Sequence, residues 1–332
     1  MQIELSIVVL RAPPNWTCES KGPWRTLMPS NVASLTDIIR RTPRKLCRAL
    51  WGRIPNSMME TDTMRFTGRF IYQNFSRNAV RIQSHHTHFM RNLPQLEVLA
   101  NLVVDFDKGS TVRLASIGCS TGAELYSALY LLRRARPDLT ILARGADISS
   151  GVVEVARRGI YRPDAPAGEA GLYLAGRAEV STQDIDELRC ILELMPDGTM
   201  RVHDWLRENV CWLTADATDR SLLDVVGKQD IVIANNFIGP MEDNLAEACL
   251  ANVMRLVKPG GLLVVEGIDT DLKTRILKAS NFRPVLLRQE EIWTADATKR
   301  GWPWVRWSHE PFHRNEPTWQ YRYTVIFRRG HC

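Results

Sequence analysis

A loop of small residues in the first half of the chain has the composition of a ligand-binding turn. The apolar run VRLASIG (112–118) predicts a buried strand, and leucines recur at helical spacing from residue 125 to residue 132. Between them lie Gly118, Cys119, Ser120, Thr121 and Gly122. Glycines in a strand-to-helix turn allow a ligand to approach the backbone closely. The sequence therefore predicts a binding site at this turn.

Two acidic residues indicate what kind of ligand this turn would take. Glu124 falls in the first turn of the predicted helix, and the third glycine of the dinucleotide motif GxGxxG is absent. A carboxylate there repels phosphate and suits a ligand with an ammonium or sulfonium group. Asp147 ends the next apolar run, where an acid can accept hydrogen bonds from both ribose hydroxyls of an adenosine. The alternative is a helix cap and a packing turn without a ligand.

Five segments resemble the S-adenosylmethionine-dependent methyltransferases of the chemoreceptor-glutamate (CheR) type. That family's stretches read roughly CSTGEEPYS, ATDIDxxxLxxARxGxY, FDxIFCRNVxIYF and NxTxFFRD. The matching segments are HTHFMRN (86–92), IGCSTGAELYS (117–127), GADISSGVVEVARRGIY (145–161), DIVIANNFI (230–238) and LVKPGGLLVVEG (256–267). The resemblance covers about residues 80 to 270 and implies S-adenosyl-L-methionine as the cofactor.

The resemblance also implies a role for single residues. Thr87 and Arg91 would lie near the methionine end of the cofactor, with Arg91 pairing its carboxylate, and Glu124 would meet its amino group. Asp147 would hold the ribose hydroxyls, and Asp216 would stand beside the adenine. The complete predicted cofactor set is Thr87, Arg91, Gly118, Cys119, Ser120, Gly122, Glu124, Asp147, Ile148, Asp216, Ala217 and Asn235.

The sequence departs from the family where the acceptor would bind. Gly239, Pro240 and Met241 replace the family's IYF, so the tyrosine that stands near the transferred methyl is absent. Five of the ten tryptophans gather between residues 293 and 319. We expect this Trp-rich loop to form a wall of the acceptor pocket, with substrate contacts from Trp302, Trp304 and Trp307. The alternative is that these rings only cover the edge of the sheet.

Three histidines next to the predicted cofactor segment could take part in catalysis. His86 and His88, with His85 beside them, could supply a general base for a hydroxyl or amine acceptor, or could simply pack at a helix start. A carboxylate acceptor needs no base. Asn235 and Asn236, in place of the family's Arg-Asn pair, complete the catalytic candidates. The seven cysteines lack CxxC spacing, so no metal site is predicted.

The predicted elements that position these residues alternate between strand and helix. Such alternation indicates a parallel sheet with helices on both faces. We predict an α/β fold with a doubly wound, seven-stranded, Rossmann-like methyltransferase sheet, whose last strand is antiparallel and follows the sixth without a helix. Further strands are predicted at 139–148, 210–216, 230–235, 261–268, 282–287 and 321–327, helices at 149–159, 241–257 and 271–280, and a turn at KPGG (258–261).

Length and charge divide the chain near residue 100. The 332 residues, 45% hydrophobic and 24% charged, suit a soluble globular protein. Residues 1–100 hold 14 basic against 6 acidic side chains, whereas the remainder holds 29 against 31. We predict a basic, mainly helical N-terminal region (1–100) with a short strand at 3–10, and a cofactor-binding domain (101–332). The basic pattern at 40–53 could contact an acidic protein, and nothing favours nucleic acid.

The sequence also bears on where the protein acts and what it does. No apolar run reaches 18 residues and the start lacks a signal-peptide pattern, so we expect a cytoplasmic protein without membrane spans. The predicted function is an S-adenosylmethionine-dependent methyltransferase with a small-molecule acceptor. Three alternatives stay open: a protein-glutamate O-methyltransferase of the CheR type, an enzyme that uses the aminobutyrate arm and releases methylthioadenosine, and a non-catalytic adenosyl-ligand-binding protein.

Overall fold

The computed structural model describes residues 44–77, 85–163, 188–296 and 299–331. The chain divides into two compact units, residues 1–58 and 59–332. The first contributes the short helix α2 (Arg44–Trp51), which begins directly after Pro43, and α3 (Asn56–Met59) lies at the division. The predicted strand at 3–10 lies outside the described residues. The predicted boundary near residue 100 falls within α5, whereas the division between the units follows residue 58.

A twisted sheet forms the centre of the larger unit. Within the described residues it has seven strands in the order β6-β2-β1-β7-β8-β10-β9. The first five of these pair in parallel, and β10 runs antiparallel to both β8 and β9, which confirms the predicted direction of the last strand. The bounds are β1 (Thr111–Ile117), β2 (Thr140–Asp147), β6 (Val210–Thr214), β7 (Gln229–Asn235), β8 (Val257–Glu266), β9 (Phe282–Pro284) and β10 (Ile326–Arg329).

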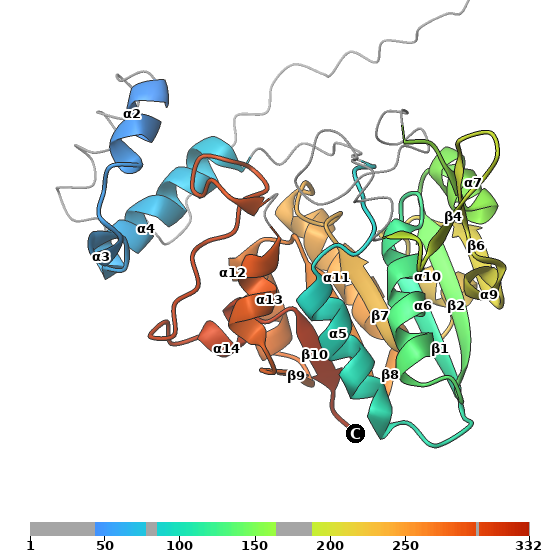
Figure 1. Cartoon of the computed structure of the whole chain (residues 1–332). Coiled ribbons are helices and arrows are strands. Elements are labelled where there is room, and N and C mark those ends of the chain that lie inside the picture. Colours follow the sequence, from blue (N-terminus) through green and yellow to red (C-terminus); the bar gives the residue numbers. More distant parts are fainter. Residues whose placement is uncertain (1–43, 78–84, 164–187, 297–298, 332) are drawn as a thin grey trace, which may run out of the picture. The chain divides into compact units, whose positions relative to one another are not determined.

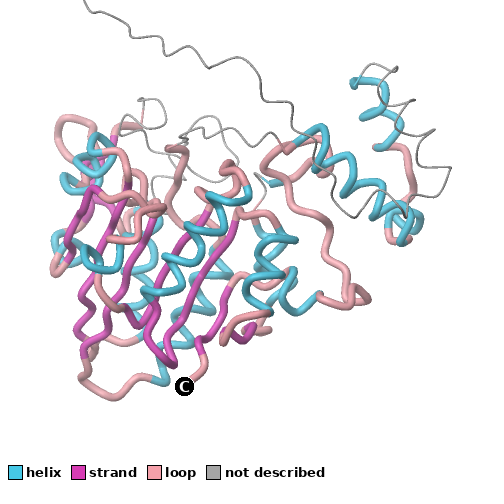
Figure 2. Tube along the Cα trace, turned by 180° about the vertical axis from the view of Figure 1, so that it is seen from behind, coloured by secondary structure: helices cyan, strands magenta, loops and turns pink. Residues whose placement is uncertain are grey.

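Helices cover both faces of this sheet, as the two opposite views in Figures 1 and 2 show. Central strands such as β1 and β7 are nearly continuous apolar runs, which is the pattern of a parallel sheet buried on both sides. One core includes α5 (Leu93–Leu102), α6 (Ala123–Ala135), α7 (Ser150–Arg158) and α13 (Gln289–Ala295). The other includes α10 (Leu222–Val226), α11 (Asp243–Leu256) and α12 (Thr270–Lys278). The doubly wound α/β fold is therefore confirmed.

A small antiparallel sheet occupies part of the stretch between residues 160 and 209, for which the sequence pattern predicts no elements. Its strand order is β3 (Ile160–Tyr161), β5 (Met200–Val202) and β4 (Leu192–Leu194). The short helix α9 (Asp204–Arg207) follows. Their buried side chains join the core on the α6 side of the main sheet, namely Tyr161, Leu192, Met200 and Val202.

Two sequence predictions about the C-terminal half are wrong. KPGG does not form a turn but belongs to β8, because the pairing of β7 with β8 shifts register there and Gly260, at φ +76°, takes up the irregularity. The last two strands are not free of helices between them, since α13 and α14 (Trp319–Arg322) intervene. The final strand consequently begins at Ile326 and not at residue 321.

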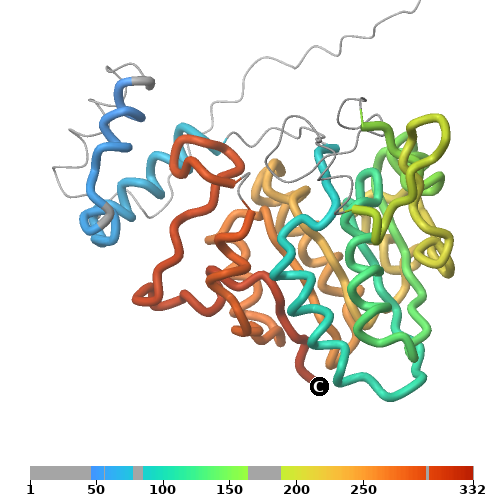
Figure 3. The backbone as a smooth tube through the Cα atoms, viewed as in Figure 1, coloured from blue at the N-terminus to red at the C-terminus, as the bar shows by residue number. Residues whose placement is uncertain are grey.

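Helix α4 (Asp62–Ile71) lies beside the segment that carries Trp302, Trp304 and Trp307 (Figure 3). It continues as a π-helical turn, Tyr72–Ser76. Arg69 donates hydrogen bonds to the buried Glu310, at 2.6 Å for the shortest, and the Tyr72 hydroxyl donates to the carbonyl oxygen of Arg306 at 2.6 Å. These bonds join residues more than 230 positions apart in the sequence. In the part of the chain that the structure describes, no helix has the length and apolarity needed to cross a bilayer.

Candidate functional site

A cleft of about 110 Å³ opens at the carboxyl ends of the parallel strands. Ligands of doubly wound sheets bind at this edge, because the loops that follow neighbouring strands meet there. The cleft is lined by residues 85–87, by the loop after β1, and by the residues that follow β2, β6 and β7. All predicted cofactor residues line it except Gly122. The lining members are Thr87, Arg91, Gly118, Cys119, Ser120, Glu124, Asp147, Ile148, Asp216, Ala217 and Asn235.

The two glycines of the loop after β1 have different tasks. Gly118 has φ +69°, and a Cβ there would lie 2.6 Å from the ring of Phe237, so the backbone and this ring together form the floor of the cleft. Gly122, at φ +87°, precedes α6 and would bring a Cβ within 2.7 Å of Trp212. It therefore serves close packing of the helix rather than contact with a ligand.

Asp147, at the end of β2, is held by two backbone donors. Its Oδ2 accepts the N–H of Ser120 at 2.8 Å, and its Oδ1 accepts the N–H of Ser149 at 3.0 Å. Each carboxylate oxygen has a second lone pair, so both can still accept a hydroxyl. Ser149 is the residue before α7, but its side chain makes no capping hydrogen bond. The partly exposed, apolar Ile148 lies next to this carboxylate in the cleft.

The other end of the cleft carries buried polar groups. Glu124 accepts a hydrogen bond from the Asn235 amide at 2.8 Å, and the same amide donates to Gln95 at 3.0 Å. Burial raises the pKa of Glu124, against the opposing effects of the Asn235 hydrogen bond and of the Arg91 charge. Arg91 donates from Nε to Asp296 at 3.0 Å, and Asp296 is almost fully buried. A carboxylate and a guanidinium are thus placed at the same end of the cleft.

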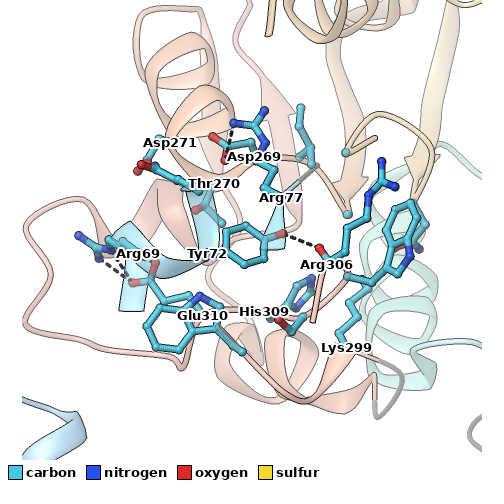
Figure 4. Close-up of a pocket in the computed structure, with 18 of the residues that line it drawn as sticks. Arg69, Tyr72, Arg77, Asp269, Thr270, Asp271, Lys299, Arg306, His309 and Glu310 are labelled. Carbon is cyan, nitrogen blue, oxygen red and sulfur yellow. Dashed lines mark hydrogen bonds and ion pairs between the residues drawn. The ribbon is translucent and has the colours of Figure 1, made fainter. Parts of the chain in front are cut away.

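A second cavity of about 230 Å³ adjoins the cleft (Figure 4). The two share four lining residues, His86, Arg91, Asn236 and Trp307. The walls come from α4 with its π-helical turn, from residues 267–271 between β8 and α12, and from residues 299–310. Among the described residues that line it, six are cations and three are carboxylates. The cations are Arg69, Arg77, Arg91, Lys299, Arg306 and Arg322, and the carboxylates are Asp269, Asp271 and Glu310.

The structure separates the candidate histidines. His86 lines both cavities, and burial together with the Arg91 charge lowers its pKa. His88 is buried and lines neither cavity, and burial lowers its pKa to about 4. His85 lines the cleft, where its carbonyl oxygen accepts the Ser120 hydroxyl at 2.8 Å. His309, which the sequence did not single out, lines the second cavity and stacks on Trp293 at 4.2 Å between ring centroids.

The predicted substrate tryptophans are also separated. Trp302 and Trp307 line the second cavity, and Trp307 reaches the cleft as well. Trp304 is 6% exposed and lines neither cavity, so the structure places it in the interior of the Trp-rich loop. Trp302 packs so closely on α4 that a Cβ on Gly68 would lie 2.0 Å from its ring. Only two of the three rings therefore line a cavity.

Several residues of the second cavity were missed by sequence reasoning. Arg69, Tyr72, Gln73 and Arg77 line it from α4, its π-helical turn and the residue that follows. Tyr72, Gln73 and Arg77 follow Arg69 by three, four and eight residues, which puts all four on one face of a helix. This spacing could have been detected in the sequence. Lys299, by contrast, has no local pattern that would single it out.

The central part of the chain matches a known family. The model for the CheR methyltransferase, SAM binding domain, matches residues 85–278, more than half of the chain. The chain belongs to the CheR methyltransferase family. Chemotaxis protein methyltransferase 2 of Vibrio cholerae serotype O1 is 24% identical over 219 residues, covering 61% of this chain and 70% of that protein.

Solved structures similar to this CheR-family chain are distant. An O-methyltransferase family protein from Burkholderia thailandensis has 14% identity and a TM-score of 0.36, covering 83% of this chain and 62% of that one. The CMeT domain of the citrinin polyketide synthase has 12% identity and a TM-score of 0.37, covering 73% and 52%. This chain thus spans less than two thirds of either.

As a member of the CheR family, the chain is a methyltransferase and its cofactor is S-adenosylmethionine. The cleft fits this molecule, since Asp147 presents two free acceptor positions for a diol and Glu124 presents a buried carboxylate for an ammonium group. The helix α4 and the Trp-rich loop lie outside the residues that match the family. More than half of the residues that line the second cavity therefore lie outside the matched part of the chain.

Proposed function

We propose that this methyltransferase transfers the methyl group of S-adenosylmethionine to a carboxylate. The observation that carries this proposal is the excess of cations, six against three carboxylates, among the described residues lining the second cavity. Cations on the wall of a cavity favour an anionic acceptor over a cationic one, although Asp243, Glu266, Asp296 and Glu316 behind the wall pair with four of the six. The cavity meets the cleft at His86, Arg91, Asn236 and Trp307, where an acceptor atom could approach the cofactor.

The residues of the cleft would hold the cofactor in a fixed position. Asp147 would accept the ribose hydroxyls, Glu124 the amino group, and Arg91 would pair with the carboxylate. The bound cofactor supplies an electrophilic methyl group on a sulfonium. A carboxylate is already ionised at neutral pH, so no residue has to remove a proton from it. The protein then has to position the acceptor and to exclude water. Trp302 and Trp307, which line the second cavity, would help to exclude water.

A glutamyl side chain of a protein is the acceptor that the family favours. The relative from Vibrio cholerae is named a chemotaxis protein methyltransferase, and its likeness to this chain supports a protein acceptor more than the small-molecule acceptor predicted from the sequence. A small organic acid is the second candidate, because residues 299–310 and α4 enclose the cavity on two sides. A carboxylate is common to both acceptors. The acidic partner predicted for the basic N-terminal region stays a prediction.

The experiment uses the purified chain and S-adenosylmethionine with a labelled methyl group. Peptides containing glutamate and a panel of small organic acids are offered as acceptors. We expect S-adenosylhomocysteine as the nucleoside product and label that mild alkali releases as methanol, because alkali hydrolyses a methyl ester. Asp147→Ala serves as the inactive control.

Two results would contradict the proposal. Methylthioadenosine as product would mean that the aminobutyrate arm, and not the methyl group, is transferred. Label that resists alkali would mean a nitrogen or hydroxyl acceptor. In that case His86, which lines both cavities and has a lowered pKa, would be the base to test by His86→Ala.

A further inference from the structure

Lys299 is one of the buried charged residues of the second cavity, together with Glu310 and Arg322. Its side chain is 4% exposed, yet it lines the cavity. Its Nζ lies 2.8 Å from Glu266 Oε1 and 3.7 Å from Asp296 Oδ2, and both carboxylates are 1% exposed. The Glu266 contact has the length of a charge-assisted hydrogen bond, whereas Asp296 lies beyond that length. At most two of the three N–H donors of the ammonium face these carboxylates, so the described residues leave at least one donor without an acceptor.

The carboxylates beside Lys299 are already engaged with other donors. Glu266 accepts hydrogen bonds from the Asn92 amide at 3.3 Å, and Asp296 accepts one from Arg91. Asp296 therefore links Lys299 to Arg91, which lines the cleft as well as the second cavity. This chain of contacts places the lysine at the end of the second cavity that adjoins the cofactor cleft.

A second buried donor comes from a different wall of the same cavity (Figure 4). Arg77 pairs with Asp269 and Asp243, but its Nε is buried and has no hydrogen-bond partner among the described residues. An unpaired buried donor destabilises a protein unless a ligand or water completes it. Lys299 and Arg77 therefore each offer a donor to an oxyanion in this cavity.

Burial also affects the charge of the lysine. Desolvation lowers the pKa of Lys299, and the Arg91 charge acts in the same direction, while Glu266 opposes both. A carboxylate bound at Nζ would favour the charged form of the lysine and supply the missing acceptor. If the only role of Lys299 were to pair with Glu266 at the end of β8, a bound carboxylate would not be needed to complete its hydrogen bonds.

We propose that Lys299 binds the carboxylate of the methyl acceptor, with Arg77 on another wall of the same cavity, and thereby selects acceptors by their charge. This inference rests on the proposed carboxylate methylation. Lys299 lies in the Trp-rich loop, outside the residues that match the SAM binding domain model. The shared chemistry is a carboxylate on a short alkyl arm, which either a glutamyl side chain or a free diacid supplies.

The test measures binding of defined probes to the full chain saturated with S-adenosylhomocysteine. The probes are N-acetyl-L-glutamate α-methylamide as a glutamyl side chain, glutarate as a free diacid, and N-acetyl-L-glutamine methylamide as the uncharged analogue. We expect a charged probe to bind the unaltered chain at least about tenfold more tightly than the uncharged one. Binding of only one charged probe tells which source of carboxylate fits, and either result supports the proposal.

The decisive variants are Lys299→Met, which removes the charge, and Lys299→Arg, which keeps it. We expect Lys299→Met to weaken the charged probe at least about tenfold and Lys299→Arg to restore part of that loss, with S-adenosylhomocysteine affinity within about twofold. Because Lys299→Met leaves Glu266 unpaired, the double variant Lys299→Met/Glu266→Gln guards against misfolding. Lys258→Met, which removes a lysine paired with Asp230 outside both cavities, is the matched control.

Two outcomes would overturn the inference. One is that the unaltered chain does not distinguish the charged probes from the uncharged one, or binds none of them. The other is that the folded Lys299 variants bind the charged probe as tightly as the unaltered chain, which would make the lysine structural. Failure of the proposed function is a separate result, since it would show as alkali-stable label or methylthioadenosine in the transfer assay.

Discussion

Replacing Glu124 by Gln should weaken cofactor binding and leave the fold as stable as before, or more stable. The variant keeps the side-chain length, and its carbonyl oxygen can still accept the Asn235 amide, which now bonds Oε1 at 2.8 Å. Only the negative charge is lost. The negative charge strengthens cofactor binding, but without a ligand it lowers the stability of the fold because it is buried. Removing it therefore changes binding and stability in opposite directions.

The size of the binding effect follows from the interaction removed. A hydrogen bond in which a partner is charged contributes about 1.5 to 3 kcal/mol, so the dissociation constant of S-adenosylhomocysteine should rise about 10- to 150-fold. Stability should move the other way. Burial raises the pKa of Glu124 in the folded state, so ionising it disfavours folding as pH rises through that pKa. At neutral pH the uncharged Gln avoids this penalty.

The same pKa shift predicts a pH dependence. A carboxylate must be ionised to pair with an ammonium group, and the raised pKa of Glu124 means that protonation begins at a higher pH than for an ordinary glutamate. S-adenosylhomocysteine affinity should therefore fall as pH is lowered through this raised pKa. In Glu124→Gln that component of the pH profile should vanish.

Calorimetric titration from pH 5 to 8 and thermal melting of the ligand-free chain test these expectations together. Glu97→Gln is the matched control, since Glu97 is 41% exposed and pairs with Arg288 away from both cavities. The reasoning is refuted if Glu124→Gln lowers the melting temperature and leaves S-adenosylhomocysteine affinity unchanged. Glu124 would then be a structural partner of Asn235 and not a cofactor ligand.

The other expectations concern the cofactor and the tryptophans. S-adenosylhomocysteine at 100 times its dissociation constant should stabilise the chain by about 2.7 kcal/mol, seen as a higher melting temperature. Stabilisation by NAD and not by S-adenosylhomocysteine would contradict S-adenosylmethionine as the cofactor. Asp147→Ala should weaken S-adenosylhomocysteine at least about tenfold in calorimetry, and unchanged affinity would place the ribose elsewhere. Trp304→Ala should destabilise the folded chain by about 3 to 5 kcal/mol, as loss of a buried ring does. Trp307→Ala should change the melting temperature little and raise the KM of the acceptor. If instead Trp307→Ala destabilised the fold and Trp304→Ala raised the KM, Trp304 and not Trp307 would contact the acceptor.

The sequence alone was sufficient to predict most of the residues that line the cleft, although Gly122, which was also predicted, does not line it. Its residues follow directly after strands that the apolar runs predict, and parallel strands bring their carboxyl ends to one edge whatever the rest of the chain does. The sequence pattern therefore predicts that Gly118, Glu124 and Asp147 lie close together, and all three line one cleft. The doubly wound sheet followed from the same alternation of strand and helix.

Loops were predicted less well, because a loop has no period that tells which way a side chain points. Trp304 and Trp307 are three residues apart, yet one is buried in the loop and the other reaches both cavities. His86 and His88 differ in the same way. The KPGG segment was misjudged because glycine and proline usually mark turns, whereas sheet pairing across a register shift kept it in β8.

Only the tertiary structure could reveal the second cavity. Its walls come from α4, from the end of β8 and from residues 299–310, and no local pattern relates segments so far apart in the sequence. The contacts that join them, such as Arg69 with Glu310 and Lys299 with Glu266, are ion pairs whose partners depend on packing. Local periodicity determines which elements form and which residues follow them. The second cavity depends instead on long-range side-chain contacts, which exist only once the chain has folded.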